Sequence, residues 1–218
     1  MRLIVQTFKE QQRLDGNGPY KFERTTSWAT DGVSLGGYGY PARKTGMIHA
    51  MFRPSDDATI YPFNIPGNMF AVSSLAKLNT LLRSMFSSGA GHDPGSEAGN
   101  LGAVIMKAID WHGKVKHKIY GEIFAYEVNG YDSYNLMDDA NVPSLLSLSY
   151  LDIIDAKKSK VYLNTRRYVL SADNPFFFKG KAGEGIGGPH VGMDYIWPLS
   201  IIMQGLTSTD DKETKNCL

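Results

Sequence analysis

The chain has 218 residues, of which 42% are hydrophobic and 21% are charged, and its formal net charge at pH 7 is +1. This is the composition of an ordinary globular protein, and so balanced a chain lacks the basic surface that attracts nucleic acids or acidic membranes. No apolar run approaches the roughly 20 residues of a membrane-spanning helix, and the N-terminal apolar run is too short for a secretory signal.

Apolar spacing predicts three helices in the first half of the chain. A short one over residues 1–14 has Leu3, Ile4, Phe8 and Leu14 on one face. Two longer ones cover 68–88 and 95–112, where apolar residues recur every three or four positions. Gly89-Ala-Gly91 is expected to end the first of these, and Asp93-Pro94 and Ser96 mark the start of the second.

The pattern then changes to a period of two. Residues 118–132 alternate in polarity, and Asn129-Gly130 is a strong hairpin signal, so a small β-hairpin is expected near 118–133. Three further helices are predicted over 138–150, 160–171 and 196–206, with a glycine-rich loop at 180–190. The recurring order of helix, polar loop and helix indicates a mainly α protein, an array of helical hairpins with a binding surface at one end.

The most distinctive polar segment is Arg53-Pro-Ser-Asp-Asp57, followed by an aromatic and proline-rich stretch. Asp56 and Asp57 are adjacent carboxylates, so in a poorly solvated cleft one of them is expected to keep its proton to higher pH. Such a carboxyl can serve as a general acid. The alternative is a helix N-terminus, with Ser55 as the cap and both aspartates in the first turn. The two interpretations are compatible.

Other catalytic classes lack their signatures. The five histidines do not have zinc-protease spacing, Cys217 is the only cysteine, and no nucleophile-elbow motif occurs. Carboxylates with aromatic side chains remain, and these are typical of carbohydrate sites. His190 is either a ligand for a sugar hydroxyl or an ordinary loop histidine. Trp197 is either a stacking platform or, more in keeping with the habits of Trp, a core residue.

Four segments together resemble glycoside hydrolase family 125, the exo-α-1,6-mannosidases of bacteria and fungi: FRPSDDATIYPFNIPGNMFA, MDDANVPSLLSLSYLD, YLNTRRYVLSADNPFFFKG and GIGGPHVGMDYIWPLSIIMQGLTS. The resemblance implies an (α/α)6 barrel of helical hairpins and inverting hydrolysis of α-mannosides, without a metal or other cofactor. It places the general acid at Asp56 or Asp57, and analogy with other barrel glycosidases favours Asp56. The substrate-binding residues that we expect are Arg53, Asp139, Asn141, Asn164, Arg166, His190 and Trp197.

One part of the family pattern is missing. The resemblance implies a catalytic base, a Glu in a His-Glu-Ser-Phe context, and this sequence does not contain it. We therefore expect residues 1–218 to form a single partial catalytic domain, an incomplete barrel with uncovered apolar helix faces. The alternative is a truncated, catalytically inactive protein that binds sugar.

Overall fold

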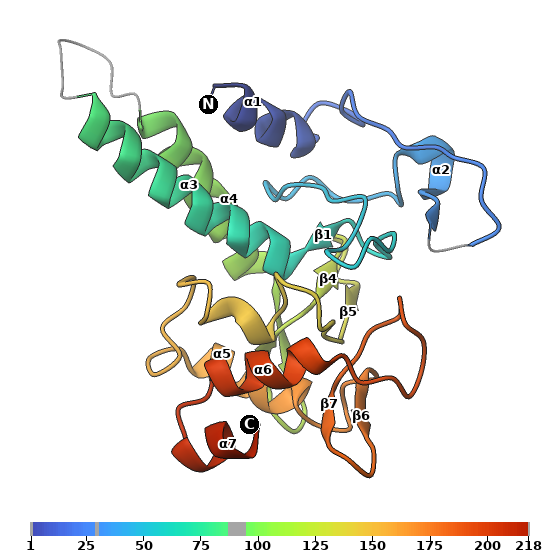
Figure 1. The fold of residues 1–218 in the computed structure, drawn as a ribbon. Helices are drawn as coiled ribbons and strands as arrows, with labels where there is room; N and C mark the ends of the chain where they lie inside the picture. Colours follow the sequence, from blue (N-terminus) through green and yellow to red (C-terminus); the bar gives the residue numbers. More distant parts are fainter. Residues whose placement is uncertain (1, 29–30, 87–94, 218) are drawn as a thin grey trace.

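A computed structural model describes residues 2–28, 31–86 and 95–217 of the chain, and the structural statements below concern these residues. It is rich in helices and has three small antiparallel sheets (Figure 1). In chain order its elements are α1 (Arg2–Gln11), α2 (Ser34–Gly37), β1 (Phe63–Asn64), α3 (Ile65–Met85), α4 (Ser96–His112), β2 (Lys114–His117), β3 (Gly121–Phe124), β4 (Glu127–Val128), β5 (Tyr134–Asn135), the 3-10 helix η2 (Leu146–Leu148), α5 (Lys160–Val169), β6 (Phe177–Lys179), β7 (Glu184–Ile186), α6 (Pro198–Leu206) and α7 (Asp211–Asn216).

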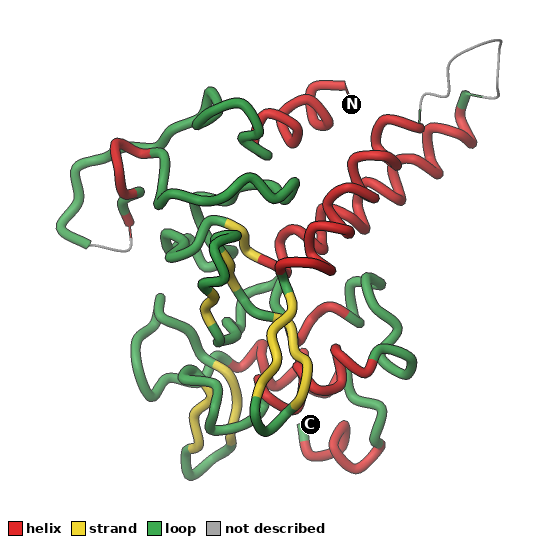
Figure 2. Tube along the Cα trace, turned by 180° about the vertical axis from the view of Figure 1, so that it is seen from behind, coloured by secondary structure: helices red, strands yellow, loops and turns green. Residues whose placement is uncertain are grey.

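The two long helices predicted from the sequence are present as α3 and α4, which run side by side and project from the body of the molecule (Figure 2). Leu75 of α3 and Ile105 of α4 are almost fully buried in the shared core. The helices pack closely at Gly102, where a Cβ would lie 3.6 Å from Leu75 Cβ, an ordinary van der Waals distance. Packing of one apolar stripe on the other therefore holds this pair together.

The start of α3 differs from the expectation by three residues. The side chain of Asn64 accepts a hydrogen bond from Gly67 N at 2.9 Å, so Asn64 caps the helix. Pro66 then lies in the first turn, where its missing N–H costs nothing, rather than ending a helix. The predicted helix end at Ser88, the Gly89-Ala-Gly91 break and the Asp93-Pro94 start lie outside the described residues.

The expected single hairpin is part of a larger set of strands. Asn129-Gly130 does connect an antiparallel pair, β4 and β5, and β1 pairs with the other edge of β4. Immediately before it, β2 and β3 form a separate hairpin that turns at residues 118–120. The glycine-rich loop at 180–190 also contains strand structure, because β6 and β7 pair there.

The helix predicted over 138–150 was wrong, apart from the short η2. The buried carboxylate of Asp138 accepts hydrogen bonds from Leu145 N at 2.8 Å and Leu146 N at 2.9 Å. These bonds fold the segment back on itself, and only three residues keep helical geometry. Local side-chain acceptors thus outcompete the helical pattern, as is common for aspartate. The later helices α5 and α6 form close to their predicted positions.

The N-terminal helix is present, but its predicted apolar face was wrong. Leu3, Ile4 and Leu14 are exposed, whereas Val5 is buried and Phe8 packs partly on the core. The helix ends at Gln11, and Arg13 follows with a φ of 51°. The buried side is therefore narrower than the sequence pattern suggested.

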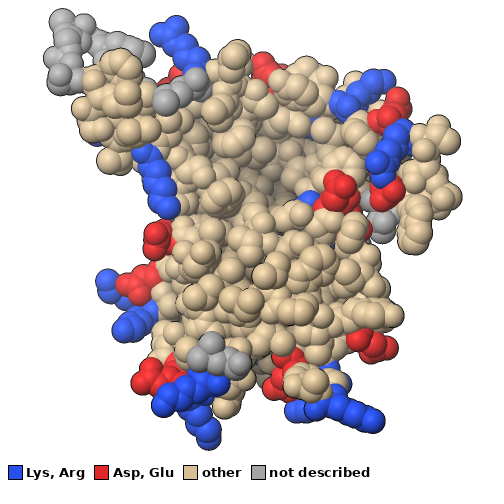
Figure 3. Space-filling model, viewed as in Figure 1, with Lys and Arg blue, Asp and Glu red and all other residues tan. Residues whose placement is uncertain are grey.

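Apolar side chains are exposed on several helices, as expected for an array that packs on further elements. On α6 they are Leu199, Ile202 and Leu206, each more than half exposed. The face that carries α6 shows few charged side chains at its centre and most of them at its margins (Figure 3). Exposed apolar side chains grouped on one helix are typical of an interface. Among the described helices, none combines the length and hydropathy needed to cross a membrane.

We predict that Ile105→Ala lowers the free energy of unfolding by about 2–5 kcal/mol, because it leaves a cavity in the buried α3–α4 interface. The matched control is Val104→Ala, one residue earlier on α4, where the side chain is half exposed. This control should change stability by less than about 1 kcal/mol. Urea denaturation of both variants makes the comparison, and equal losses would contradict this account of the core.

Candidate active site

A buried ion pair fixes the segment that contains the two candidate acids. Arg53 Nε lies 2.6 Å from Glu127 Oε1, and Arg53 Nη2 lies 2.9 Å from Oε2. The two side chains are 4% and 0% exposed. Burial works to lower the pKa of Arg53, but the hydrogen bond and charge of Glu127 outweigh it, so the pKa is raised. This is the bidentate geometry that makes arginine–carboxylate pairs specific.

Glu127 is held in place by the three-stranded sheet. It lies on the central strand β4, opposite Asn64 of β1 and Asn135 of β5. Its Oε2 also accepts hydrogen bonds from Ile60 N at 3.3 Å, Tyr61 N at 3.4 Å and Asn135 Nδ2 at 3.2 Å. The carboxylate thus ties the sheet to both ends of the Arg53–Tyr61 loop, and its buried charge is fully engaged.

Residues 53–57 form a tight turn, so the alternative interpretation as a helix N-terminus was wrong. Arg53 N donates to Asp57 O at 2.8 Å, and Asp56 N donates to Arg53 O at 3.0 Å. Asp56 has a φ of 71°, in the left-handed region that aspartate tolerates better than most residues. The turn separates the two carboxylates, because Asp56 is exposed and Asp57 is buried.

Asp57 is the point at which distant parts of the sequence meet. Its Oδ2 accepts a hydrogen bond from Ser55 Oγ at 2.7 Å. Its Oδ1 lies 3.5 Å from Nδ1 of His190, whose side chain is half exposed. The glycine-rich segment after β7 therefore reaches the Arg53–Asp57 turn, and it places His190 beside Asp57.

Asp139 lies in the same cluster, on the other side of Ser55. It is fully buried, and its Oδ1 accepts hydrogen bonds from Asn141 N at 2.8 Å and Asn141 Nδ2 at 2.7 Å. Its Oδ2 is buried and has no hydrogen-bond partner among the described residues. Burial raises the pKa of Asp139, against the lowering effects of Asn141, Ser55 and Arg53.

Glycine fits closely beside this carboxylate. A Cβ on Gly188 would lie 3.1 Å from the Asp139 carboxyl group, tighter than most side-chain contacts allow. Ala140 N also donates to Gly187 O at 2.9 Å, so the two segments are joined through their backbones. The Gly187-Gly188 pair thus lets the loop that carries His190 approach the aspartates.

Three of the expected ligand residues make their contacts elsewhere in the structure. Asn164 donates to Glu122 O at 3.1 Å, and Arg166 bonds to Gln204 O and Glu213, each at 3.0 Å. Trp197 packs partly on the core, and its backbone N–H donates to Ile186 O at 3.1 Å. The first two side chains join α5 to β3, α6 and α7, and Trp197 follows the core interpretation. None of these contacts involves the cluster around Asp57.

Sequence reasoning missed three residues of this region: Ser55 as a donor to Asp57, Glu127 as the partner of Arg53, and Asp138 as a loop acceptor. Glu127 had a detectable signal, because it is the one charged residue in the apolar stretch Ile123–Val128. Ser55 had none beyond its place between Arg53 and Asp57. Asp138 was attributed to a helix start, although its fully buried carboxylate organises a loop.

The carboxyl groups on this turn and on the segments that contact it differ in their exposure to solvent. Asp56 is open to a ligand, Asp57 and Asp139 are enclosed, and His190 stands at the margin. Such a set can donate a proton and accept hydrogen bonds from several hydroxyl groups. Within the described ranges no group of three or more His, Cys, Asp or Glu residues is placed to hold a metal ion.

We predict that Glu127→Gln destabilises the protein by about 3–5 kcal/mol, because the substitution leaves the Arg53 charge buried without its partner. The control is Glu184→Gln, which removes an exposed ion pair with Lys179. Exposed pairs contribute less than about 1 kcal/mol. Denaturant unfolding at pH 7 tests the difference, and similar small losses in both variants would show that the buried pair is dispensable.

We also predict a pH effect from Asp138, whose pKa burial raises to about 7. The folded state then binds a proton that the unfolded state has lost, so this residue's contribution to stability falls as pH rises from about 4 to 7. Asp138→Asn should remove that slope, even though it lowers stability overall. His49, whose pKa is lowered to about 3, makes a contribution to stability that rises with pH. Subtracting the variant's curve of unfolding free energy against pH from that of the wild type removes the His49 contribution and leaves that of Asp138. A difference curve without slope would refute the assignment.

Comparison with known proteins identifies the family of the chain. A model of the metal-independent alpha-mannosidases (GH125) matches residues 1–218. The chain is 43% identical over 215 residues to the meiotically up-regulated gene 157 protein of Schizosaccharomyces pombe, covering 97% of this chain and 41% of that protein.

A solved structure gives the same result for the fold. It is a metal-independent alpha mannosidase of Streptococcus pneumoniae in a non-productive complex with alpha-1,6-mannobiose, 34% identical, with a TM-score of 0.92. The match covers 99% of this chain and 50% of that one, so the present chain spans half or less of the length of both relatives. The chain belongs to glycoside hydrolase family 125, the metal-independent α-mannosidases.

Proposed function

We propose that the protein containing this sequence is an inverting exo-α-1,6-mannosidase that removes terminal mannose from glycans. The observation that carries the proposal is the cluster of Asp57, Ser55, Asp139 and His190, built on a turn that also exposes Asp56. Support for the linkage comes from the streptococcal relative, which was solved with alpha-1,6-mannobiose. Support for the reaction class comes from the family itself.

In this proposal Asp56 is the general acid. Its side chain is exposed on the turn, where it can reach the oxygen of a glycosidic bond. Asp57 has both carboxylate oxygens occupied, by Ser55 and His190, and it is buried. We therefore assign Asp57 to positioning: it fixes the turn and the imidazole of His190, which hydrogen-bonds a sugar hydroxyl. Arg53 is enclosed with Glu127 and acts through the turn, without touching the sugar.

The remaining groups would bind the terminal sugar. Asp139 has an oxygen without a partner, and its other oxygen is fixed by Asn141. A buried acceptor of this kind selects a ligand that supplies a hydroxyl donor, because leaving it unpaired is costly. We assign Asp139 and Asn141 to recognition of sugar hydroxyl groups near the bond that is cleaved.

The catalytic base is proposed to come from a part of the family domain that this chain does not span. An inverting site needs a second carboxylate about 6.5–9.5 Å from the acid, with a water between them. The exposed apolar faces of α3 and α6 would then pack on further helices of an (α/α)6 barrel, of which residues 1–218 form a part. The second candidate function is sugar binding without hydrolysis, which the missing His-Glu-Ser-Phe motif favours for the 218-residue chain by itself.

We predict opposite signatures for the two aspartates in a protein that includes the missing segments. Asp56→Asn should reduce hydrolysis of α-1,6-mannobiose by about 10²–10⁴-fold, the usual contribution of a general acid. The same variant should lose far less activity on an aryl mannoside with a good leaving group, which departs without a proton. Asp57→Asn should reduce the hydrolysis of both substrates by the same factor, because it disturbs the turn rather than the proton transfer.

The matched control is Asp152→Asn, since Asp152 is another exposed aspartate with a left-handed backbone, at φ 55°. Its activity should equal that of the wild type. Equal losses on both substrates for Asp56→Asn would remove it from the role of acid. The 218-residue chain should bind mannobiose in a calorimetric titration without turnover, and turnover would overturn the assignment of the base to another segment.

A further inference from the structure

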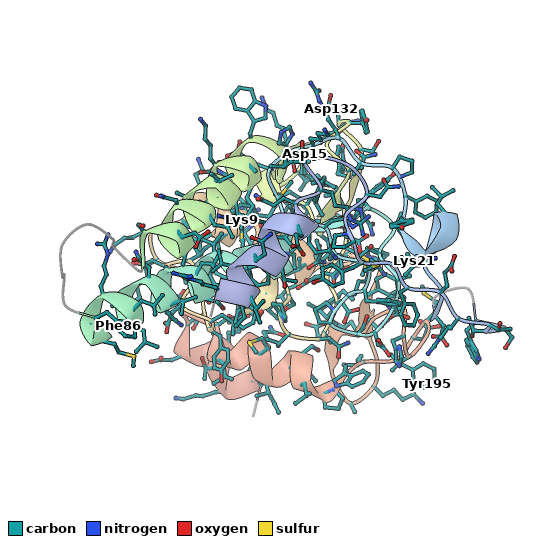
Figure 4. The ribbon with its side chains drawn as sticks, turned by 90° about the horizontal axis from the view of Figure 1, so that it is seen from above. Lys9, Asp15, Lys21, Phe86, Asp132 and Tyr195 are labelled. Atoms are coloured by element: carbon teal, nitrogen blue, oxygen red, sulfur yellow. The ribbon has the colours of Figure 1, made fainter. Side chains whose placement is uncertain are left out.

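A pocket separate from the Asp57 cluster lies beside the N-terminal helix, at the base of the loop whose tip carries Arg53–Asp57. Its volume is about 340 Å³, and its lining comes from the segment after α1, the segment around α2 and two residues that flank the loop, His49 and Phe63. The view from above shows Lys9 on α1 and Lys21 on the side of α2 (Figure 4). This volume suits a small ligand.

The charge of the lining has a single sign. Arg13, Arg43 and Lys44 line the pocket, and its lining includes no aspartate or glutamate. Among the described residues, none of these three cations has a carboxylate within ion-pair distance. Concave surfaces with one sign of charge concentrate the opposite charge from solution. The pocket therefore favours an anionic ligand.

Arg13 is the central cation. Its Nη1 donates to Tyr38 O at 2.5 Å, and its Nη2 donates to Tyr20 O at 3.4 Å, so backbone carbonyls hold the guanidinium in place. Burial lowers the pKa of Arg13, and the opposing influence comes from Tyr38 rather than from a carboxylate. A part-buried guanidinium that only neutral acceptors surround is a site that an anion would complete.

His49 packs against Arg13 at the wall of the pocket. Its side chain is buried, and Arg13 Nη1 lies 3.2 Å from its Nε2. Since arginine can only donate, Nε2 is the acceptor, and neutral His49 carries its proton on Nδ1. That Nδ1 is buried without a hydrogen-bond partner. Gly39, with a φ of 85°, packs on the same ring, because a Cβ there would lie 3.2 Å from Cε1.

The rest of the lining has flat apolar surfaces. Tyr38, Tyr40, Pro41 and Phe63 accompany the cations, and aromatic faces are the usual contact for sugar rings. We propose that this pocket binds a phosphate monoester carried by a sugar, with the phosphate on Arg13, Arg43 and Lys44 and the ring against the tyrosines. The proposal does not depend on hydrolysis at the Asp56–Asp57 turn.

Calorimetric titration of the 218-residue chain with three probes tests it, at low ionic strength so that charge effects are not screened. Inorganic phosphate should bind in a saturable manner in the millimolar range. Mannose 6-phosphate should bind more tightly than phosphate, and mannose at the same concentrations should not bind to this pocket. Equal affinities for phosphate and mannose 6-phosphate would overturn the sugar component, and a lack of saturable phosphate binding would overturn the proposal.

Variants locate the binding. Arg13→Gln should weaken phosphate binding by about tenfold or more, the usual size of a charge-assisted contact. Arg43→Gln with Lys44→Gln changes only exposed residues, so it should fold normally and weaken binding several-fold. The control is Arg24→Gln, an exposed arginine outside the pocket that pairs with Asp31. If Arg24→Gln weakens binding as much as the Arg43 and Lys44 double variant, the binding is non-specific and the proposal fails.

Discussion

The buried pair of Arg53 and Glu127 is the interaction on which the site depends. One carboxylate receives the guanidinium, two backbone N–H groups and one amide, and so joins β4, β5 and the loop after Arg53. Because two buried charges are tolerated only when every hydrogen bond is made, the loop has little freedom to take another conformation. The turn at Asp56 and Asp57 belongs to this loop and is therefore held in one conformation. A group that transfers a proton needs such a fixed position.

Around this fixed turn, two other segments supply polar groups through close backbone approach. Asp138 and Asp139 are neighbours with different tasks: the first accepts the N–H groups of the following loop, and the second faces Ser55 and Gly188. The glycine pair before His190 makes the approach of the last segment sterically possible. The site thus consists of three loops held by the sheet and by backbone hydrogen bonds, with the helices α3, α4 and α5 as the supporting core.

Two helices of the chain expose apolar side chains. Exposed leucine, isoleucine and methionine side chains on α3 and α6 form faces that a monomer of this size would normally bury. The relatives are about twice as long or longer, and packing of these faces on the rest of the family domain is what we propose.

The sequence by itself determined the long helices, the hairpin at Asn129-Gly130 and the family, and through the family resemblance it grouped Asp57, Asp139, Asn141 and His190 with other residues in one expected site. These follow from local periodicity and from residue types that recur in one order. It did not determine the loop at 138–150, where a buried acceptor overrides helical spacing, or the face of α1 that is buried. Nor could it pair Arg53 with Glu127, or Arg166 of α5 with Glu213 of α7, because ion pairs between distant segments depend on which elements become neighbours. Those contacts exist only once the chain has folded, since burial and strand register decide them.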